Sequence, residues 1–413
     1  MASTREGYLA IKKESTVALA VKPTNFVRFK SGDINYTPEV IANNPIQGTR
    51  WNAITPVDGK ATAAGTYNMD LDLNESMHFI AAAMGKIASS TDISSASDGS
   101  VMKHVIDHAN SVYGLTIEQG KGNLSDDSNN RQNYQVDRAF GCIVDKFTIS
   151  GGEGVIDMAL DIKAHGMLQK ANLINDASSG SAVVINLASA EGFVATDDVN
   201  IFDNTPQSDT AEVSALSLTA KTLTLDSISN SYTVTNSGKV ELIPQTPSFT
   251  DDPNPFSFVH CSFQFGSDTA AAASSAEENV ENWDLQYMNN SEERFGSLRN
   301  TPSVIAVKGN GAKISFTKYF ENVADRDRYQ DRAKRACILT ISNNKIVSSD
   351  DTNNAKETIK FIASDVRFTS YDMPTGTDDL YAINAELELF HDSTDGRALR
   401  VEFTNGKSAA YYA

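Results

Sequence analysis

The chain contains little cysteine, little tryptophan and no long apolar run. Of its 413 residues, three are Cys and two are Trp. Cys142, Cys261 and Cys337 lie far apart among apolar neighbours, and an odd number gives no disulfide framework. We therefore expect buried, reduced thiols, which favours assembly in a cytoplasm. No stretch approaches the roughly 20 apolar residues of a membrane-spanning helix. The polar start, residues 1–7, does not resemble a signal peptide.

Positive charge is also scarce. The sequence has 35 Lys and Arg against 53 Asp and Glu, a formal net charge of −18. Proteins that grip nucleic acid by neutralising phosphates need clustered Lys and Arg. Docking on anionic membranes needs them as well. The charge balance therefore argues against both functions.

The residue patterns of known catalytic and metal sites are missing. His104 and His108 would share one helix face, as zinc ligands do, but no zincin pattern surrounds them, so an exposed helix face is favoured. The acidic turn at 125–130 could offer oxygens to calcium, yet it lacks the central Gly and late Glu of a calcium loop. No nucleophile elbow or apolar carboxylate pair is present. We predict no catalytic residue, no metal and no cofactor.

Composition divides the chain into three parts, which we predict to be domains: 1–171, 172–248 and 249–413. The middle part contains no Met, Trp, Cys, Arg or His and is rich in Ser, Thr, Val and Asp. Its short alternating runs are separated by turn residues, a pattern typical of a small all-β domain.

The two flanking parts resemble each other. Leu-Thr-Ile at 115–117 is followed by Ser-Asp-Asp-Ser-Asn-Asn at 125–130, and Leu-Thr-Ile at 339–341 is followed, at the same spacing, by Ser-Asp-Asp-Thr-Asn-Asn at 349–354. Further on, Asp-Lys-Phe-Thr at 145–148 parallels 365–369. Turn residues recur by chance because few residue types suit turns. The ordered repetition nevertheless predicts an internal duplication.

Both flanking parts predict a long strand followed by a helix. Residues 61–73 alternate cleanly between apolar and polar, which indicates a strand with one buried face. Asn74 is the expected N-cap of a helix that Gly85 ends. The second part repeats this with a strand at 312–320 and a helix over 323–335. An extra segment near 86–110 begins Ser- and Asp-rich and then predicts a helix.

The polar faces of these strands carry repeated acidic residues. A solvated sheet face is the simplest interpretation of each one. The set consists of Asp70, Asp72, Asp157, Asp161, Glu386 and Glu388.

Two long segments, 33–59 and 287–308, show no clear period. Long loops in compact domains are usually functional or disordered. Aromatic residues and Arg are enriched in protein interfaces, so we expect an assembly contact rather than packing on the same domain. The candidate contact residues are Pro45, Ile46, Arg50, Trp51, Arg294, Phe295, Leu298 and Arg299.

Several of these stretches together resemble a known family. They are Ile-Asn-Tyr-Thr-Pro at 34–38, the Gly-Thr-Arg loop at 48–50, the strand at 59–73 with its Asn-Glu helix start, and 140–150 with a hairpin return to Ala164. The first part is similar to the tail tube (major tail) proteins of long-tailed bacteriophages. The resemblance covers most of 1–166 and, through the repeat, 254–405, and leaves the middle part unexplained.

The resemblance implies a mainly β fold: two tandem tail-tube-type β-sandwich or barrel domains, each with a flanking α-helix, plus a small all-β inserted domain. Six such domains form a ring in this family, and rings stack into a hollow tube. Two domains per chain imply a trimer with pseudo-sixfold symmetry. The long loops would bridge rings, and the middle domain would project outward as a decoration.

Further expectations concern partners and location. The acidic strand faces would line the bore, so that viral DNA passes without specific binding. The implied partners are other copies of the chain, a tape measure protein, a tail terminator and a baseplate or tip. The protein would be assembled in the host cytoplasm and end in the virion tail, with no membrane partner.

Two other functions remain open on the residues alone. One is a surface- or carbohydrate-binding adhesin or surface-layer protein. The other is a hydrolase whose site follows no known motif. A tube protein forms rings or hollow filaments under native conditions, whereas an adhesin stays a small oligomer.

Overall fold

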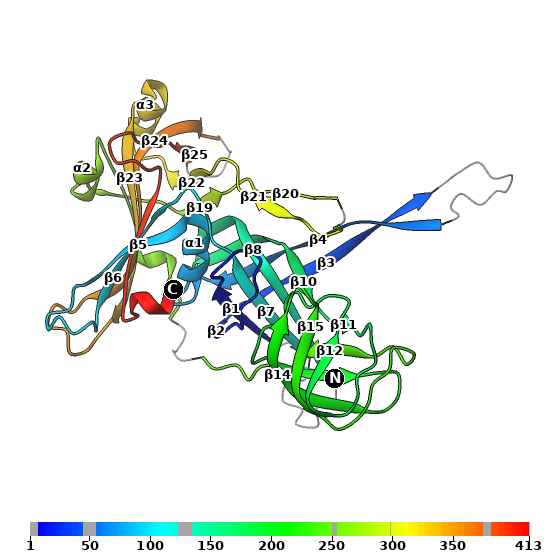
Figure 1. The fold of residues 1–413 in the computed structure, drawn as a ribbon. Coiled ribbons are helices and arrows are strands. Elements are labelled where there is room, and N and C mark those ends of the chain that lie inside the picture. Colours follow the sequence, from blue (N-terminus) through cyan, green and yellow to red (C-terminus); the bar gives the residue numbers. More distant parts are fainter. Residues whose placement is uncertain are drawn as a thin grey trace.

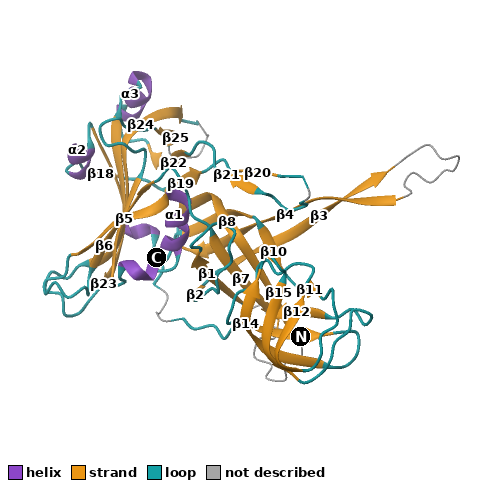
Figure 2. Ribbon diagram, in the orientation of Figure 1, coloured by secondary structure: helices purple, strands orange, loops and turns teal. Residues whose placement is uncertain are grey.

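A computed structural model describes residues 7–43, 55–122, 134–249, 254–297, 299–374 and 381–412. These residues form a mainly β molecule with three α-helices (Figures 1 and 2). The expected fold class is confirmed. Strands β1–β10 make up what we call the first half, β11–β16 the inserted segment, and β17–β26 the second half.

The first half pairs its strands in two layers. The outer layer runs β2–β1–β7–β8–β10, and the inner layer runs β3–β4–β9–β8. Helix α1 (Ser76–Met84) packs on β8 and is buried along its whole length. The strands are β1 (Tyr8–Lys13), β2 (Asn25–Val27), β3 (Ser31–Asn43), β4 (Thr55–Asp70), β5 (Gly85–Asp92), β6 (Met102–His108), β7 (Leu115–Gly122), β8 (Tyr134–Gly151), β9 (Asp157–Ala164) and β10 (Gly166–Leu168).

The second half repeats this order. Its outer layer runs β18–β17–β23–β24–β26 and continues into β6 and β5, and its inner layer runs β19–β22–β25–β24. Its helices are α2 (Thr269–Ala273) and α3 (Ala324–Asp331), with short 3-10 turns η2 (Phe258–His260) and η3 (Ala409–Tyr412). The strands are β17 (Cys261–Gly266), β18 (Glu277–Glu278), β19 (Asn282–Met288), β20 (Glu292–Arg294), β21 (Val304–Ala306), β22 (Gly311–Tyr319), β23 (Arg335–Ile346), β24 (Lys356–Asp372), β25 (Ala382–Leu389) and β26 (Arg400–Asn405).

Irregularities in the ladders also match between the halves. A long strand, β8 or β24, leaves the outer layer and enters the inner one in each half. The β8–β9 pairing shifts register between Val144 and Lys146, and the β24–β25 pairing shifts between Phe368 and Ser370. Because an extra residue bends its strand, the two shifts sit where each long strand changes layers.

One strand pair joins the halves into a single inner sheet. Strand β19 of the second half pairs antiparallel with β8 of the first, with Trp283 opposite Gly151. The inner sheet therefore runs without interruption as β3–β4–β9–β8–β19–β22–β25–β24. Trp283, which is 2% exposed, fits there because a Cβ on Gly151 would lie 2.4 Å from its ring.

The inserted segment folds on a separate sheet. Its strands are ordered β11–β16–β13–β14–β15–β12. They enclose a second hydrophobic core, to which Val136 of β8 and Leu168 of β10 also contribute, whereas both halves share the first core. The strands are β11 (Ala171–Asn172), β12 (Gly180–Asn186), β13 (Asp198–Phe202), β14 (Ser208–Ser217), β15 (Thr222–Ile228) and β16 (Lys239–Leu242).

Several element predictions were wrong. The extra segment near 86–110 is not helical: β5 and β6 form a hairpin that extends the outer layer of the second half. Its pairing with β26 is a contact between distant parts of the sequence, which overrides local pattern. The segments 33–59 and 287–308 contain strand residues of β3, β4, β19, β20 and β21.

Two helix boundaries also differ from prediction. Strand β4 ends at Asp70, and Asp72 accepts hydrogen bonds from the backbone N–H groups of Asn74 and Glu75, so α1 starts after Glu75 rather than Asn74. Helix α3 ends at Asp331, with Arg332 in the left-handed region. The three thiols are free as expected, with Cys142 and Cys337 buried and Cys261 half-buried.

Candidate assembly surfaces

The inner sheet ends in two edges that have no partner among the described residues. At one end, β3 pairs with β4 alone. At the other, the last residues of β24 pair with β25 alone. A free edge presents a row of unpaired backbone N–H and C=O groups, which is a template for another strand.

The pairing of β8 with β19 shows, within one chain, how two such edges join. Thr148 lies opposite Gln286, and Phe147 lies opposite Tyr287. The rings of Phe147 and Tyr287 are stacked, with centroids 5.4 Å apart and planes at 13°. Aromatic cross-strand pairs stabilise sheets beyond their backbone hydrogen bonds.

The β3–β4 hairpin forms an arm that reaches well beyond the rest of the molecule (Figure 1). Three apolar side chains on it are exposed: Val40 at 63%, Ile41 at 49% and Val57 at 53%. An exposed apolar surface on an arm is a candidate contact site for another protein. The predicted contact residues Pro45, Ile46, Arg50 and Trp51 lie outside the described residues.

The second predicted contact segment folds back on the first half. The β20–β21 hairpin lies beside the base of β4, where the Ala61 N–H donates to Asn300 O at 2.7 Å and Lys60 sits 4.8 Å from the Phe295 ring. Arg299 pairs with Glu191 of the inserted segment at 3.0 Å. Arg294 is exposed on β20, and Leu298 lies outside the described residues.

Most of the acidic candidates share the polar face of the inner sheet. Asp70 and Asp157 lie opposite each other on β4 and β9, Asp161 lies further along β9, and Glu386 and Glu388 lie on β25. Their strand neighbours of alternate position are buried, so this face points away from the core. Asp72 is beyond the strand end and holds the start of α1 instead.

This face carries cations as well as acids. Lys30 contacts Asp70 at 2.6 Å and Asp157 at 2.5 Å, and Lys313 contacts Glu386 at 3.2 Å. The face is therefore polar and of mixed charge, which is less negative than the net charge of the chain suggests.

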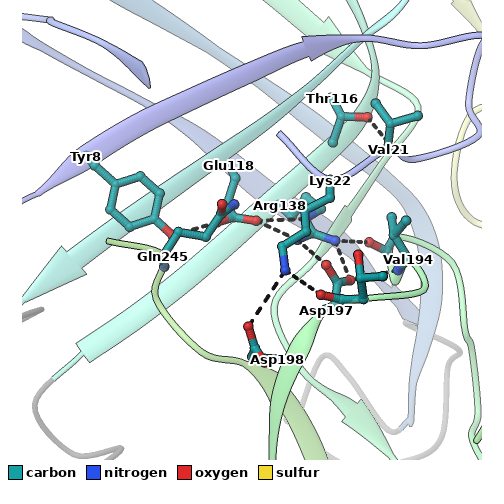
Figure 3. Close-up of polar contacts among 12 residues, drawn as sticks. Tyr8, Val21, Lys22, Thr116, Glu118, Arg138, Val194, Asp197, Asp198 and Gln245 are labelled. Carbon is teal, nitrogen blue, oxygen red and sulfur yellow. Dashed lines mark hydrogen bonds and ion pairs between the residues drawn. The ribbon is translucent and has the colours of Figure 1, made fainter. Parts of the chain in front are cut away.

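A buried ionic network fastens the inserted segment to the first half (Figure 3). Arg138 on β8 donates to Glu118 on β7 at 2.6 and 2.9 Å and to Asp197 of the inserted segment at 2.6 and 2.9 Å. Arg138, Glu118 and Asp197 are each at most 2% exposed. Burial lowers the pKa of Arg138, but the two carboxylates outweigh it, so the pKa lies above its usual range and the guanidinium is always charged.

Two further residues extend this network. The Tyr8 hydroxyl donates to Glu118 at 2.5 Å, and the Gln245 side chain, where the chain leaves the inserted segment, donates to Glu118 at 2.8 Å. Burial and the Glu118 charge raise the pKa of Tyr8 well above its usual value. Sequence analysis missed this network. The available signal was a pair of charged residues, Glu118 and Arg138, within otherwise apolar strands.

The histidines predicted to share a helix face lie on strand β6 and have other partners. His104 contacts Ser90 at 2.7 Å and Lys407 O at 2.9 Å, and His108 contacts Asn310 at 2.7 Å. Within the described ranges, no group of three His, Cys, Asp or Glu side chains is placed to hold a metal ion. No helix there is long and apolar enough to cross a membrane.

These features, a mainly β chain with free sheet edges and a projecting arm, are accompanied by a family match. A family model described as phage tail tube protein matches residues 4–233, more than half of the chain. The chain belongs to the phage tail tube family. No curated protein matches it. Membership makes this a structural component of a phage tail that assembles with copies of itself and with other tail proteins. The match includes the first half and most of the inserted segment.

Proposed function

We propose that this tail tube protein closes into a ring of three chains with pseudo-sixfold symmetry, and that the rings stack into the conduit for DNA ejection. One observation carries the proposal: a single chain already contains a side-by-side contact between two halves of the same strand order. The free edge strand β3 corresponds to β19 in the strand order, and the free end of β24 corresponds to β8. The second half is then a duplicated copy of the first.

The internal junction specifies the register of the contact between chains. In the matched strand orders, β24 corresponds to β8 and β3 corresponds to β19. If β24 pairs with β3 of the next chain in the register of β8 with β19, Asp372 lies opposite Asn35 of that chain. Tyr371 then faces Tyr36 of that chain, in the positions of the stacked Phe147 and Tyr287. A second aromatic pair would thus support the ring contact. Closing the ring pairs every edge of the inner sheet, which removes sites of uncontrolled aggregation.

Stacking follows from a contact that does not close on itself. The β3–β4 arm with Val40, Ile41 and Val57 would bridge to the adjacent ring, together with Pro45, Ile46, Arg50 and Trp51, which lie between the two strands in the sequence. A heterologous contact of this kind generates a filament. In Figure 1 the arm extends past the other strands of the inner sheet, which supports this role.

The remaining parts of the chain take secondary roles. The polar inner face would line the bore with Asp70, Asp157, Asp161, Glu386 and Glu388, so that DNA slides past without specific binding. Residues 172–248 would form a decoration domain on the outside, between tube domains 1–171 and 249–413. The tape measure, tail terminator and tip or baseplate proteins are the expected partners, assembly takes place in the host cytoplasm, and no catalysis is assigned.

A double cysteine variant tests the ring. With Asn35→Cys and Asp372→Cys, mild oxidation of assembled protein should link chains into covalent trimers on a denaturing gel. Asn35→Cys with Asn384→Cys, one strand away on β25, is the matched control and should stay unlinked. Covalent hexamers would show that the ring contains six chains rather than three. Absence of linkage in intact tubes would reject the edge contact, and failure to form rings or tubes would favour an adhesin.

A further inference from the structure

Both halves carry a groove at the same place, beside the end of the inner sheet. In the first half it borders Lys30, whose N–H donates to Asn68 O at 2.7 Å. In the second it borders Glu281, whose N–H donates to Thr317 O at 2.8 Å. The first groove encloses a cavity of about 80 Å³, and the second is an open groove of about 420 Å³. The same fold therefore leaves one groove nearly full and the other empty.

The first groove is filled by the segment that leads into β17. Phe256 is fully buried there: its carbonyl accepts from the Ile156 N–H at 2.9 Å and Ser257 pairs with Val155. Pro255 lines the remaining cavity. The chain between the inserted segment and the second half thus acts as a cover for the first half.

The second groove has no such cover among the described residues. The Phe320 N–H donates to Tyr381 O at 2.8 Å, as the Leu71 N–H donates to Ile156 O at 2.9 Å in the first half. In the described part of the chain, however, no residue of the second half takes the position of Phe256. Apolar side chains at this site stay exposed: Tyr381 at 57%, Tyr319 at 48% and Phe320 at 37%. Such a patch indicates a binding surface.

We propose that residues 1–7 of a neighbouring chain cover the second groove. Strands β1 and β17 hold the same place in their halves, each beside β7 or β23. The segment before β17 covers the first half of its own chain. By the same geometry, the segment before β1 covers the second half of the neighbouring chain in the ring. This inference rests on the ring proposed above.

Length and charge fit this occupant. Ile11 and Phe265 hold the same place, so Tyr8 corresponds to Ser262. Phe256 lies six residues before Ser262, and Ala2 lies six residues before Tyr8. The rim of the second groove carries Glu277, Glu281 and Glu321, which form no ion pair with the rest of the described chain. Arg5 provides a cation for this rim, and Met1 and Ala2 provide apolar side chains for Phe320 and Tyr381.

A disulfide trap tests the proposal in assembled rings. The background carries Cys261→Ser, because Cys261 lines the groove. Ala2→Cys with Tyr381→Cys should link neighbouring chains, so that most of the protein runs as covalent oligomers. Ala2→Cys with Val155→Cys is the matched control: Val155 is the exposed residue that already pairs with Ser257, and no link should form.

The outcomes separate this inference from the ring itself. If Asn35→Cys and Asp372→Cys link chains but Ala2→Cys and Tyr381→Cys do not, the ring stands and the cover is rejected. If neither pair links, the ring fails and the cover with it. A link within one chain, or a link from Tyr381→Cys to Ile46→Cys in stacked tubes, would show another occupant and overturn the proposal.

Discussion

At the scale of residues, Arg138 carries the joint between the inserted segment and the first half. Its guanidinium bonds two carboxylates that come from opposite sides of the joint, Glu118 and Asp197. Removing water from three charged groups is costly, and their mutual attraction offsets this only while all hydrogen bonds are made. We therefore expect the network to fix the orientation of the inserted segment more than it adds to stability.

Replacing Arg138 with Met should lower the free energy of unfolding by about 3–5 kcal/mol, because two buried carboxylates lose their partner. Urea unfolding followed at the inserted segment would measure this. Arg299→Met is the control: its pair with Glu191 also holds the inserted segment, but to the second half, and its side chains are 40% and 46% exposed, so its loss should cost at most about 1 kcal/mol. Equal losses in the two variants would contradict this account.

His78 makes stability depend on pH. It is buried against the rings of Tyr411 and Tyr412, at 5.0 and 4.9 Å, and burial lowers its pKa from 6.5 to about 4. In the unfolded chain it takes up a proton below its ordinary pKa, while the folded chain keeps it neutral. Stability is therefore full above pH 6.5 and falls as pH drops toward 4.

Changing His78 to Phe should flatten this dependence. The expected difference between the two proteins approaches about 3 kcal/mol at pH 4, since each pKa unit corresponds to about 1.4 kcal/mol. Chemical unfolding of both proteins at several pH values between 7 and 4 measures it. Parallel curves for the two proteins would show that other groups, such as carboxylates, cause the pH dependence.

At the scale of elements, strict alternation of apolar and polar residues predicted strands well. The repeated turn residues, in contrast, predicted poorly which residues of the two halves correspond. The Leu-Thr-Ile stretches at 115–117 and 339–341 do not hold equivalent places. Ile117 pairs with Ile11 of β1, whereas Cys337 holds that position against Phe265 of β17. The register shifts between Leu115 and Ile117 and between Arg335 and Cys337 agree with this second alignment. Because similar residues recur along both strands, the match seen in the sequence is displaced by four residues from the match that the strand pairings give.

The sequence could not predict contacts between distant elements. The β5–β6 hairpin is held by β26, almost 300 residues away, with Val401 opposite Ile106. In the sequence, Arg138 and Glu118 look like ordinary charged residues of two strands. Only the fold shows that Asp197 of the inserted segment lies beside Arg138. The free edges of β3 and β24 likewise depend on which strands pair, which a one-dimensional pattern does not contain.

The arm is the element whose role can be tested without disturbing the core. Ile41 and Val57 lie opposite each other on it and are exposed. Changing both to Lys should leave folding and ring formation intact but prevent stacking, because the inter-ring contact would bury unpaired charge. Electron microscopy would show rings in place of tubes. Val184→Lys with Leu218→Lys, exposed on the inserted segment, should leave tubes unchanged.

At the scale of the whole molecule, the distribution of charge matters more than its sum. The net charge of −18 suggested a strongly repulsive bore. On the polar face of the inner sheet, however, Lys30 and Lys313 contact acidic neighbours. Small neutral side chains such as Thr66, Ser315 and Asn384 separate these charged groups. A surface of this kind has few sites to hold a phosphate, so if it lines the proposed bore, mild repulsion would suffice to keep DNA moving.

Reversing charge on this face should slow DNA passage. Asp161 and Glu386 hold matching places beside the register shifts of the two halves. Asp161→Lys with Glu386→Lys would place rings of cations along the bore, which bind phosphates in a salt-dependent manner. Virions with such tubes should eject DNA slowly at low salt and recover at high salt. Glu212→Lys with Asp350→Lys changes the net charge equally at exposed sites off this face, so ejection should stay normal. Equal slowing in both variants, or none in the first, would place the polar face outside the bore.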